Sequence, residues 1–194
     1  MNKQEWCIEQ HAKTNHQYSE YLPYEFHLRM VANAAKDFQH LLDNELDYFT
    51  GEKIGYLSRK DKFVSLREAC LLAAWGHDLI EDTRVSYNDV MNQLGQEAAD
   101  IIYAVSNEKG KSRAERANDK YYEGIRNTPG AVFVKLADRI ANVQYSKMTK
   151  SRMFEMYKKE NDHFLTSLGF VEGQAHPLGE MCHYLEKLFD DGTK

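Results

Sequence analysis

Apolar residues recur along most of the chain three and four positions apart, which is the spacing of an amphipathic helix, whereas regular alternation of apolar and polar residues is scarce. Only 3 Pro and 11 Gly interrupt the 194 residues, which favours long helices over many short strands. The pattern therefore predicts an all-α fold in which residues 1–194 form a single domain.

The predicted helices are separated by short breaks. We expect them over residues 1–20, 24–46, 65–82, 86–95, 96–108, 116–127, 131–148, 152–168 and 177–191. Pro23 and the Pro-Gly pair at 129–130 interrupt the helical pattern, and Ser65 followed by Glu68 has the signature of a capping box. Residues 44–64 have mixed character and predict an insertion or long loop between the second helix and the helix that follows Ser65.

Composition narrows the classes of protein to consider. The net charge of -5 disfavours a nucleic-acid-binding surface, and an anionic small molecule would need a local basic pocket or a metal. The chain has no apolar run long enough to span a bilayer and no signal peptide at its start, so no membrane association is expected. Its three cysteines, Cys7, Cys70 and Cys182, are odd in number and far apart, which predicts a reduced, cytoplasmic setting.

Within the stretch GHDLIEDTR, residues 76–84, four ionisable side chains lie within six positions directly after an apolar run: His77, Asp78, Glu81 and Asp82. Glu81 lies one helical turn beyond His77, and Asp82 one turn beyond Asp78. Like charges at this spacing destabilise a helix by about 0.2–0.5 kcal/mol per pair, so a compensating cation is a natural hypothesis. The ordinary alternative is a solvated helix end.

Two other segments contain possible partners for this cluster. Asp138 lies in VFVKLADRIANV, where apolar neighbours make an unmatched carboxylate costly. One interpretation is that Asp138 forms a salt bridge with Lys135, Arg139 or a neighbouring helix. The other is that it is a further ligand of a metal site that includes His77 and Asp78. His27 lies beside apolar residues of the second helix and is either a core histidine or a fourth ligand. Imidazole with carboxylate suits Mn, Fe, Zn or a similar divalent ion.

The order of these residues resembles the ligand pattern of the HD superfamily of metal-dependent phosphohydrolases: His27, then His77-Asp78, then Asp138. HDLIEDT is similar to the hydrolase-domain motif of RelA/SpoT-type alarmone enzymes, and VKLADRIANV is similar to a second segment of that family. The resemblance covers about residues 64–168, with a weaker match at 8–36. It implies an HD-domain helical bundle, and the chain resembles a stand-alone small alarmone hydrolase without a synthetase domain.

The resemblance also implies a reaction and a role for each matching residue. The four residues of the HD pattern would bind one Mn²⁺, although other divalent metals also suit such ligands. Glu81 and Asp82 would position or deprotonate water and assist the leaving group. Asn142 and Tyr157 would contact the nucleotide. The reaction removes pyrophosphate from the 3′ position of (p)ppGpp and leaves GDP or GTP, so the expected partner is a small nucleotide.

A basic run from residue 107 to 120 lies where the resemblance implies a mobile basic segment near the phosphates. Lys109, Lys111 and Arg113 are therefore candidates for a phosphate clamp. The alternative is a solvated charged face, which is the usual role of such a run.

The chain departs from the family pattern around its first histidine. The family motif is GQxRxxGxPYIxHP, and this chain has NHQYSEYLPYEFHL at residues 15–28. Tyr18 and Ser19 stand near the place of a basic pair that the family uses against base and phosphates. Tyr18 could stack on a base but carries no positive charge, which leaves guanine selectivity open. The separation of His27 and His77 is also about twice that of small alarmone hydrolases.

Two alternatives to (p)ppGpp hydrolysis follow from these departures. One is an HD-type phosphohydrolase for another nucleotide, such as an adenine alarmone or a nucleoside monophosphate. The other is a regulatory or antitoxin-like binding module with little turnover. The insertion at 44–64 is the feature that suggests it.

Overall fold

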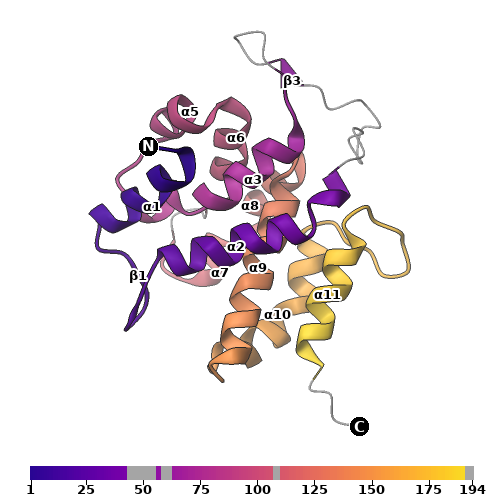
Figure 1. The fold of residues 1–194 in the computed structure, drawn as a ribbon. Coiled ribbons are helices and arrows are strands. Elements are labelled where there is room, and N and C mark those ends of the chain that lie inside the picture. The colour runs from indigo at the N-terminus through magenta and orange to yellow at the C-terminus, as the bar shows by residue number, and fades with distance from the viewer. Residues whose placement is uncertain (43–55, 58–62, 107–109, 191–194) are drawn as a thin grey trace.

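The computed structural model describes residues 1–42, 56–57, 63–106 and 110–190, and in this part of the chain it confirms the predicted all-α class (Figure 1). The helices are α1 (Lys3–Lys13), α2 (Glu25–Asp37), η1 (Gln39–Leu42, a 3-10 helix), α3 (Leu66–Gly76), α4 (Leu79–Asp82), α5 (Tyr87–Leu94), α6 (Gln96–Val105), α7 (Arg113–Arg116), α8 (Asp119–Asn127), α9 (Ala131–Met148), α10 (Met153–Ser167) and α11 (Gly179–Phe189). Two small antiparallel ribbons accompany them: β1 (Gln17–Ser19) with β2 (Leu22–Pro23), and β3 (Tyr56–Leu57) with β4 (Phe63–Val64).

Helix α9 is the centre of the bundle. It packs against α2, α3, α6, α8, α10 and α11, and Figure 1 shows it below α2 with α10 and α11 beside it. Val134, Leu136, Ile140 and Val143 have no exposed surface, which explains why this segment is apolar on most of its faces. Burying each such side chain contributes roughly 1.5–3 kcal/mol. Asp138 is carried on this helix, so its position is set by the core.

Local sequence signals set several helix ends. Ser65 and Glu68 form the predicted capping box at the start of α3. Gly95, with φ of 107°, ends α5 as expected. Gly130 begins α9 with φ of 82°, and a Cβ at this position would lie 2.5 Å from the Cys70 sulfur. Glycine is therefore required there by both conformation and space.

Three predicted helices end earlier than expected. The first stops at Lys13, because Asn15 adopts a left-handed conformation with φ of 52° and the chain turns into the β1–β2 ribbon. The second stops at Asp37 and continues only as the 3-10 helix η1. The third is interrupted after Gly76: Asp78 has φ of -102° and ψ of 4°, and the short helix α4 follows. Apolar spacing continues through this break, so the pattern did not reveal it.

The remaining predicted helices agree with α5, α6, α8, α9, α10 and α11 to within a few residues at their ends. Most of the expected insertion at 44–64 lies outside the described residues, as do residues 107–108 of the helix predicted at 96–108. Within the described ranges, no helix is both long and apolar enough to cross a bilayer.

Candidate functional site

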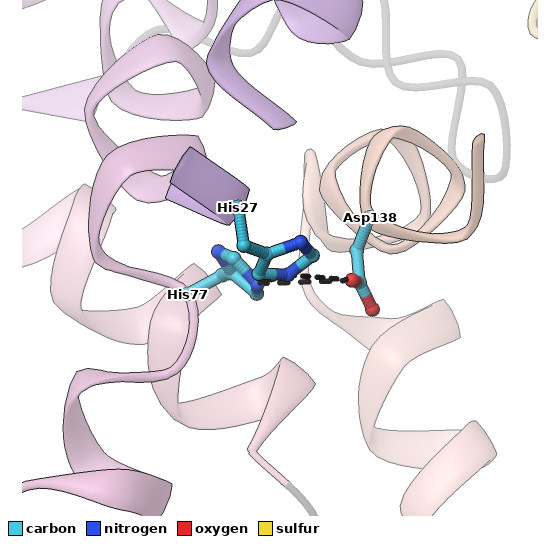
Figure 2. Close-up of side chains that lie close together, drawn as sticks. All are labelled: His27, His77 and Asp138. Atoms are coloured by element: carbon cyan, nitrogen blue, oxygen red, sulfur yellow. Dashed lines mark hydrogen bonds and ion pairs between the residues drawn. The ribbon is translucent and has the colours of Figure 1, made fainter. Parts of the chain in front are cut away.

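Three side chains from separate helices meet at the centre of the bundle (Figure 2). His27 comes from α2, His77 follows the last residue of α3, and Asp138 comes from α9. The Nε2 atoms of the two histidines are 3.2 Å apart. Asp138 Oδ1 lies 3.4 Å from His27 Nε2 and 3.7 Å from His77 Nε2. Both imidazoles are only 2% exposed, so these polar atoms face one another away from bulk water.

Asp78 is the fourth predicted ligand, and its carboxylate lies beside the two histidines. Its Oδ2 lies 2.8 Å from His77 Nε2 and 3.7 Å from His27 Nε2. The break between α3 and α4 makes this possible, because it turns Asp78 out of the helical path. The hydroxyl of Tyr24 donates a hydrogen bond to the same carboxylate oxygen. The structure thus brings together all four residues of the predicted HD pattern.

The chemistry of this donor set fits a divalent cation. His77 Nδ1 lies 3.0 Å from the Ala74 carbonyl oxygen and donates to it, so when the ring is neutral, as a metal ligand must be, its lone pair is at Nε2. That lone pair faces a second imidazole nitrogen and two carboxylates. Nitrogen and oxygen lone pairs directed at one point are the ligands that first-row divalent metals bind.

Electrostatics without a metal show how strongly the site attracts positive charge. Burial alone would lower the pKa of His77, but the carboxylates of Asp78 and Asp138 raise it to about 9. Burial alone would raise the pKa of the Asp78 carboxyl, but His77 lowers it well below its usual range. The same holds for Asp138, whose pKa is lowered by Lys135 and the two histidines. The site therefore holds two largely enclosed carboxylates, 20% and 13% exposed, that need cationic partners.

Asp138 takes part in both of the interactions considered from sequence. Its Oδ2 accepts from Lys135 Nζ at 3.1 Å, which is the salt bridge of the ordinary alternative. Its Oδ1 faces His27 and His77, and also accepts from Asn142 Nδ2 at 2.6 Å. One carboxylate oxygen is thus paired within α9, and the other is directed at the histidines.

A cavity of about 710 Å³ opens over this cluster. It is lined by His27, Asp78 and Asp138 from the cluster and by Tyr18, Glu81, Asp82, Asn142 and Tyr157 from the other predicted site residues. Burial raises the pKa of the Asp82 carboxyl, with further contributions from the Asp78 and Glu81 carboxylates, to about 7. A carboxyl group with this pKa can exchange a proton near neutral pH, which suits a general base.

The predicted nucleotide contacts have partners within the protein. The Tyr18 hydroxyl donates to Asn142 Oδ1 at 3.1 Å, and its ring stacks on His27 with centroids 4.7 Å apart. The ring of Tyr157 lies 4.7 Å from the guanidinium carbon of Arg139. Tyr18 therefore covers a histidine of the cluster, and the amide of Asn142 links it to Asp138.

The predicted phosphate clamp is only partly described. Lys109 lies outside the described residues, and for Arg113 the structure describes the helix α7 but not the side chain. Lys111 is exposed and is not among the residues that line the cavity. Arg116, from the same basic run, does line it. The clamp stays a prediction for these three residues.

Several lining residues were not assigned to the site from sequence, namely Lys135, Arg139, Asp119 and Glu160. In total the lining carries the cations Arg116, Lys135 and Arg139 and the carboxylates Asp78, Glu81, Asp82, Asp119, Asp138 and Glu160. Lys135 lies one turn before Asp138 on the same helix, a spacing that the sequence contains. Tyr24 is 54 positions from Asp78, and no local pattern indicates this pair. Carboxylates outnumber cations here, so a polyanionic ligand requires a bound cation.

Comparison with known proteins supports a relationship to one group of hydrolases. No family model matches the chain. The mouse protein called guanosine-3′,5′-bis(diphosphate) 3′-pyrophosphohydrolase MESH1 is 31% identical over 122 residues, which cover 62% of this chain and 67% of the mouse protein. Proteins of the same name from Drosophila melanogaster and human are 30% and 31% identical over 77 and 74 residues. These stretches cover 40% and 38% of this chain but only 43% and 41% of the fly and human proteins.

A solved structure has a similar fold over almost the whole chain. It is described as a metazoan ortholog of SpoT that hydrolyses ppGpp and plays a role in starvation responses. The TM-score is 0.62 at 18% sequence identity, and the match covers 96% of this chain and 95% of that chain. At this identity the similarity establishes the arrangement of helices.

Proposed function

The chain belongs to the HD-superfamily (p)ppGpp hydrolases, the family that includes MESH1, and from this premise we propose that it hydrolyses the 3′-pyrophosphate of (p)ppGpp to give GDP or GTP and pyrophosphate. One observation carries the proposal: His27, His77 and Asp138 meet, Asp78 lies beside His77, and Glu81 and Asp82 line the cavity over this cluster. Acidic groups beside a divalent-ion site are typical of the active site of a phosphohydrolase.

We assign His27, His77, Asp78 and Asp138 as the ligands of one divalent ion, with Mn²⁺ as the proposed metal. When bound, such an ion supplies the Lewis acidity that lets a water lose its proton near neutral pH and offsets charge on the phosphates. The protein keeps these ligands in place through second contacts. Ala74 fixes the tautomer of His77, and Asn142 and Tyr24 hold the two carboxylates.

Asp82 is the proposed general base, and Glu81 the residue that assists it. A carboxylate at Asp82 accepts the proton of the attacking water, and its pKa of about 7 leaves a substantial fraction ionised at neutral pH. Glu81 lines the same cavity, where it can orient that water or assist departure of the pyrophosphate. A pair of carboxylates allows one to be ionised while its neighbour is protonated.

The substrate class follows from the charges around the cavity. Arg116, Lys135 and Arg139 can offset phosphate oxygens, and Tyr157 offers an aromatic ring. Tyr18 stands near the position where the family has a basic residue, and it donates to Asn142. This observation favours a second candidate within the same class, a nucleotide 3′-pyrophosphate with adenine instead of guanine. We also infer a cytoplasmic setting, because Cys7, Cys70 and Cys182 are buried and unpaired.

The test combines metal analysis with hydrolysis assays on purified, Mn²⁺-loaded protein. Wild type should release pyrophosphate from ppGpp or its adenine analogue, and Asp78→Ala should lose both metal and activity. A Glu81→Gln, Asp82→Asn double variant should retain metal but lose turnover. Deoxynucleoside monophosphates serve as the control substrates. Hydrolysis of those alone would refute the 3′-pyrophosphate assignment, and a biological effect that survives in the double variant would indicate a binding module.

A further inference from the structure

Two histidines beside the metal-ligand cluster have no role in the function proposed above. His11 lies near the end of α1, and His16 lies after the turn that follows this helix, directly before β1. The left-handed conformation of Asn15 reverses the chain, and the backbone N–H of His16 donates to the His11 carbonyl oxygen at 3.1 Å. As a result the two Nδ1 atoms are 3.0 Å apart, which is hydrogen-bonding distance.

Tyr24 holds both rings in place. The ring of His16 stacks on that of Tyr24 with centroids 3.7 Å apart and planes at 14°, and the ring of His11 stacks at 4.6 Å and 26°. The Tyr24 hydroxyl in turn donates to Asp78. The three rings thus form one stack, which the Tyr24 hydroxyl joins to the metal-ligand cluster.

The other edge of His16 faces Asp82, the proposed general base. His16 Nε2 lies 3.9 Å from Asp82 Oδ2. This separation is longer than a hydrogen bond. Such contacts are often long in unliganded sites and shorten when substrate binds, or are bridged by one water. His16 is 26% exposed, so it has room to make this adjustment.

The surroundings of both rings select one pair of tautomers. His11 is 1% exposed, and burial lowers its pKa to about 4, so it is neutral. Two neutral rings that meet through their Nδ1 atoms share one hydrogen. His11 Nε2 is buried without a hydrogen-bond partner among the described residues, where a bare lone pair costs less than an unsatisfied N–H. The hydrogen therefore lies on His11 Nδ1, and His16 carries its own on Nε2, directed at Asp82.

We propose that His16 is a positioning residue that donates a hydrogen bond to Asp82. This bond turns the free lone pair of the Asp82 carboxylate toward the attacking water. Stacking on Tyr24 holds the ring of His16, and His11 fixes it in its Nε2–H tautomer. As a guide to magnitude, removing a group that orients a ligand of a metal site typically costs about 10–100-fold in metal affinity or activity. The proposal rests on the proposed function, since it assigns His16 to the general base of that reaction.

The first test does not depend on activity. Long-range ¹H–¹⁵N NMR of the histidine rings reports which nitrogen carries the proton. We expect the Nε2–H form for His16 and the Nδ1–H form for His11, and His11→Phe should release His16 into a mixture of tautomers. An Nδ1–H form for His16 in wild type would overturn the proposal whatever the substrate proves to be.

The second test compares variants of His16 in the Mn²⁺-loaded protein. His16→Phe keeps a ring on Tyr24 but removes both nitrogens, and it should lower kcat about 10–100-fold with KM and metal content changed less than about threefold. His16→Gln retains an N–H donor of similar reach and should recover most of that loss. His183→Phe is the matched control, because its side chain is 78% exposed on α11 and does not line the cavity.

A background that lacks the base shows whether His16 acts through it. With Asp82→Asn already present, His16→Phe should cause no further loss of kcat, because residues that act as a unit are not additive. A full additional loss, a loss of bound metal, or unchanged kcat in His16→Phe would each overturn the proposal. Failure of the proposed function has a different signature, because the wild type itself would then leave nucleotide 3′-pyrophosphates intact.

Discussion

His11 should make a measurable, pH-dependent contribution to the stability of this protein. Its ring is 1% exposed, stacks on Tyr24 and shares a hydrogen bond with His16. Burial lowers its pKa from 6.5 to about 4, with Asp78 opposing the shift and His16 adding to it. In the unfolded chain the ring regains the ordinary value of about 6.5. The folded and unfolded states therefore bind different numbers of protons between these two values.

The direction of the effect follows from this difference. Between about pH 6.5 and pH 4 the unfolded chain holds a proton on His11 that the folded protein excludes, so acid favours unfolding. The contribution of the neutral ring is fully present above the unfolded pKa and is lost as the pH falls toward the folded one. At 1.36 kcal/mol per pKa unit the full span corresponds to about 3 kcal/mol, of which about 2 kcal/mol is lost between pH 7 and pH 5.

The assay is urea unfolding of metal-free wild type and His11→Phe at pH 7 and pH 5. His11→Phe keeps an aromatic ring on Tyr24 and cannot be protonated. Other groups also titrate in this interval, including Asp82 with its pKa of about 7, but they are common to both proteins and cancel in the comparison. The free energy of unfolding of wild type relative to His11→Phe should therefore fall by about 2 kcal/mol on acidification. For a chain of this size that corresponds to a relative shift of about 4–8 °C in Tm.

His183→Phe is the control, since its side chain is 78% exposed and its surroundings change little on unfolding. The stability of wild type relative to this control should stay nearly constant between the two pH values. If the difference in the free energy of unfolding between wild type and His11→Phe also stayed constant, to within about 0.5 kcal/mol, the conclusion that His11 is neutral in the folded protein would be wrong. The tautomer argument for His16 would then lose its basis.

Three further predictions test the site and the fold. Asp138→Asn removes the carboxylate that faces both histidines, so kcat/KM should fall more than about 100-fold and metal analysis should find no bound ion; retained metal would contradict the ligand assignment. Lys135→Met removes a cation that lines the cavity and pairs with Asp138, and initial rates should show KM raised about tenfold or more, whereas an unchanged KM would exclude a phosphate contact. Gly130→Ala places a Cβ 2.5 Å from the Cys70 sulfur on a backbone in the left-handed conformation, so the free energy of unfolding measured in urea should fall by about 2–5 kcal/mol. A fall of less than about 1 kcal/mol would contradict this account.

The sequence alone determined what depends on neighbouring residues. Helix α9 has the predicted limits, Ala131 to Met148, because a Pro-Gly break precedes it and its apolar face repeats at helical spacing. The capping box at Ser65 and Glu68 is equally local, since its partners are three positions apart. The order of the histidine and aspartate residues in the HD pattern was also sufficient to identify the four side chains that the fold brings together.

Only the tertiary structure decided how distant segments meet. The break after Gly76 turns Asp78 toward the histidines, although the apolar pattern runs through it without interruption. The bond from Tyr18 to Asn142 joins positions 124 apart, and the contact of His16 with Asp82 depends on a turn that the sequence indicated as helix. Periodicity shows which face of a segment is buried, but the packing of one helix on another determines which polar groups share that interior. For this protein, the candidate metal ligands could be predicted from the sequence, whereas the groups that contact and orient them could be identified only from the fold.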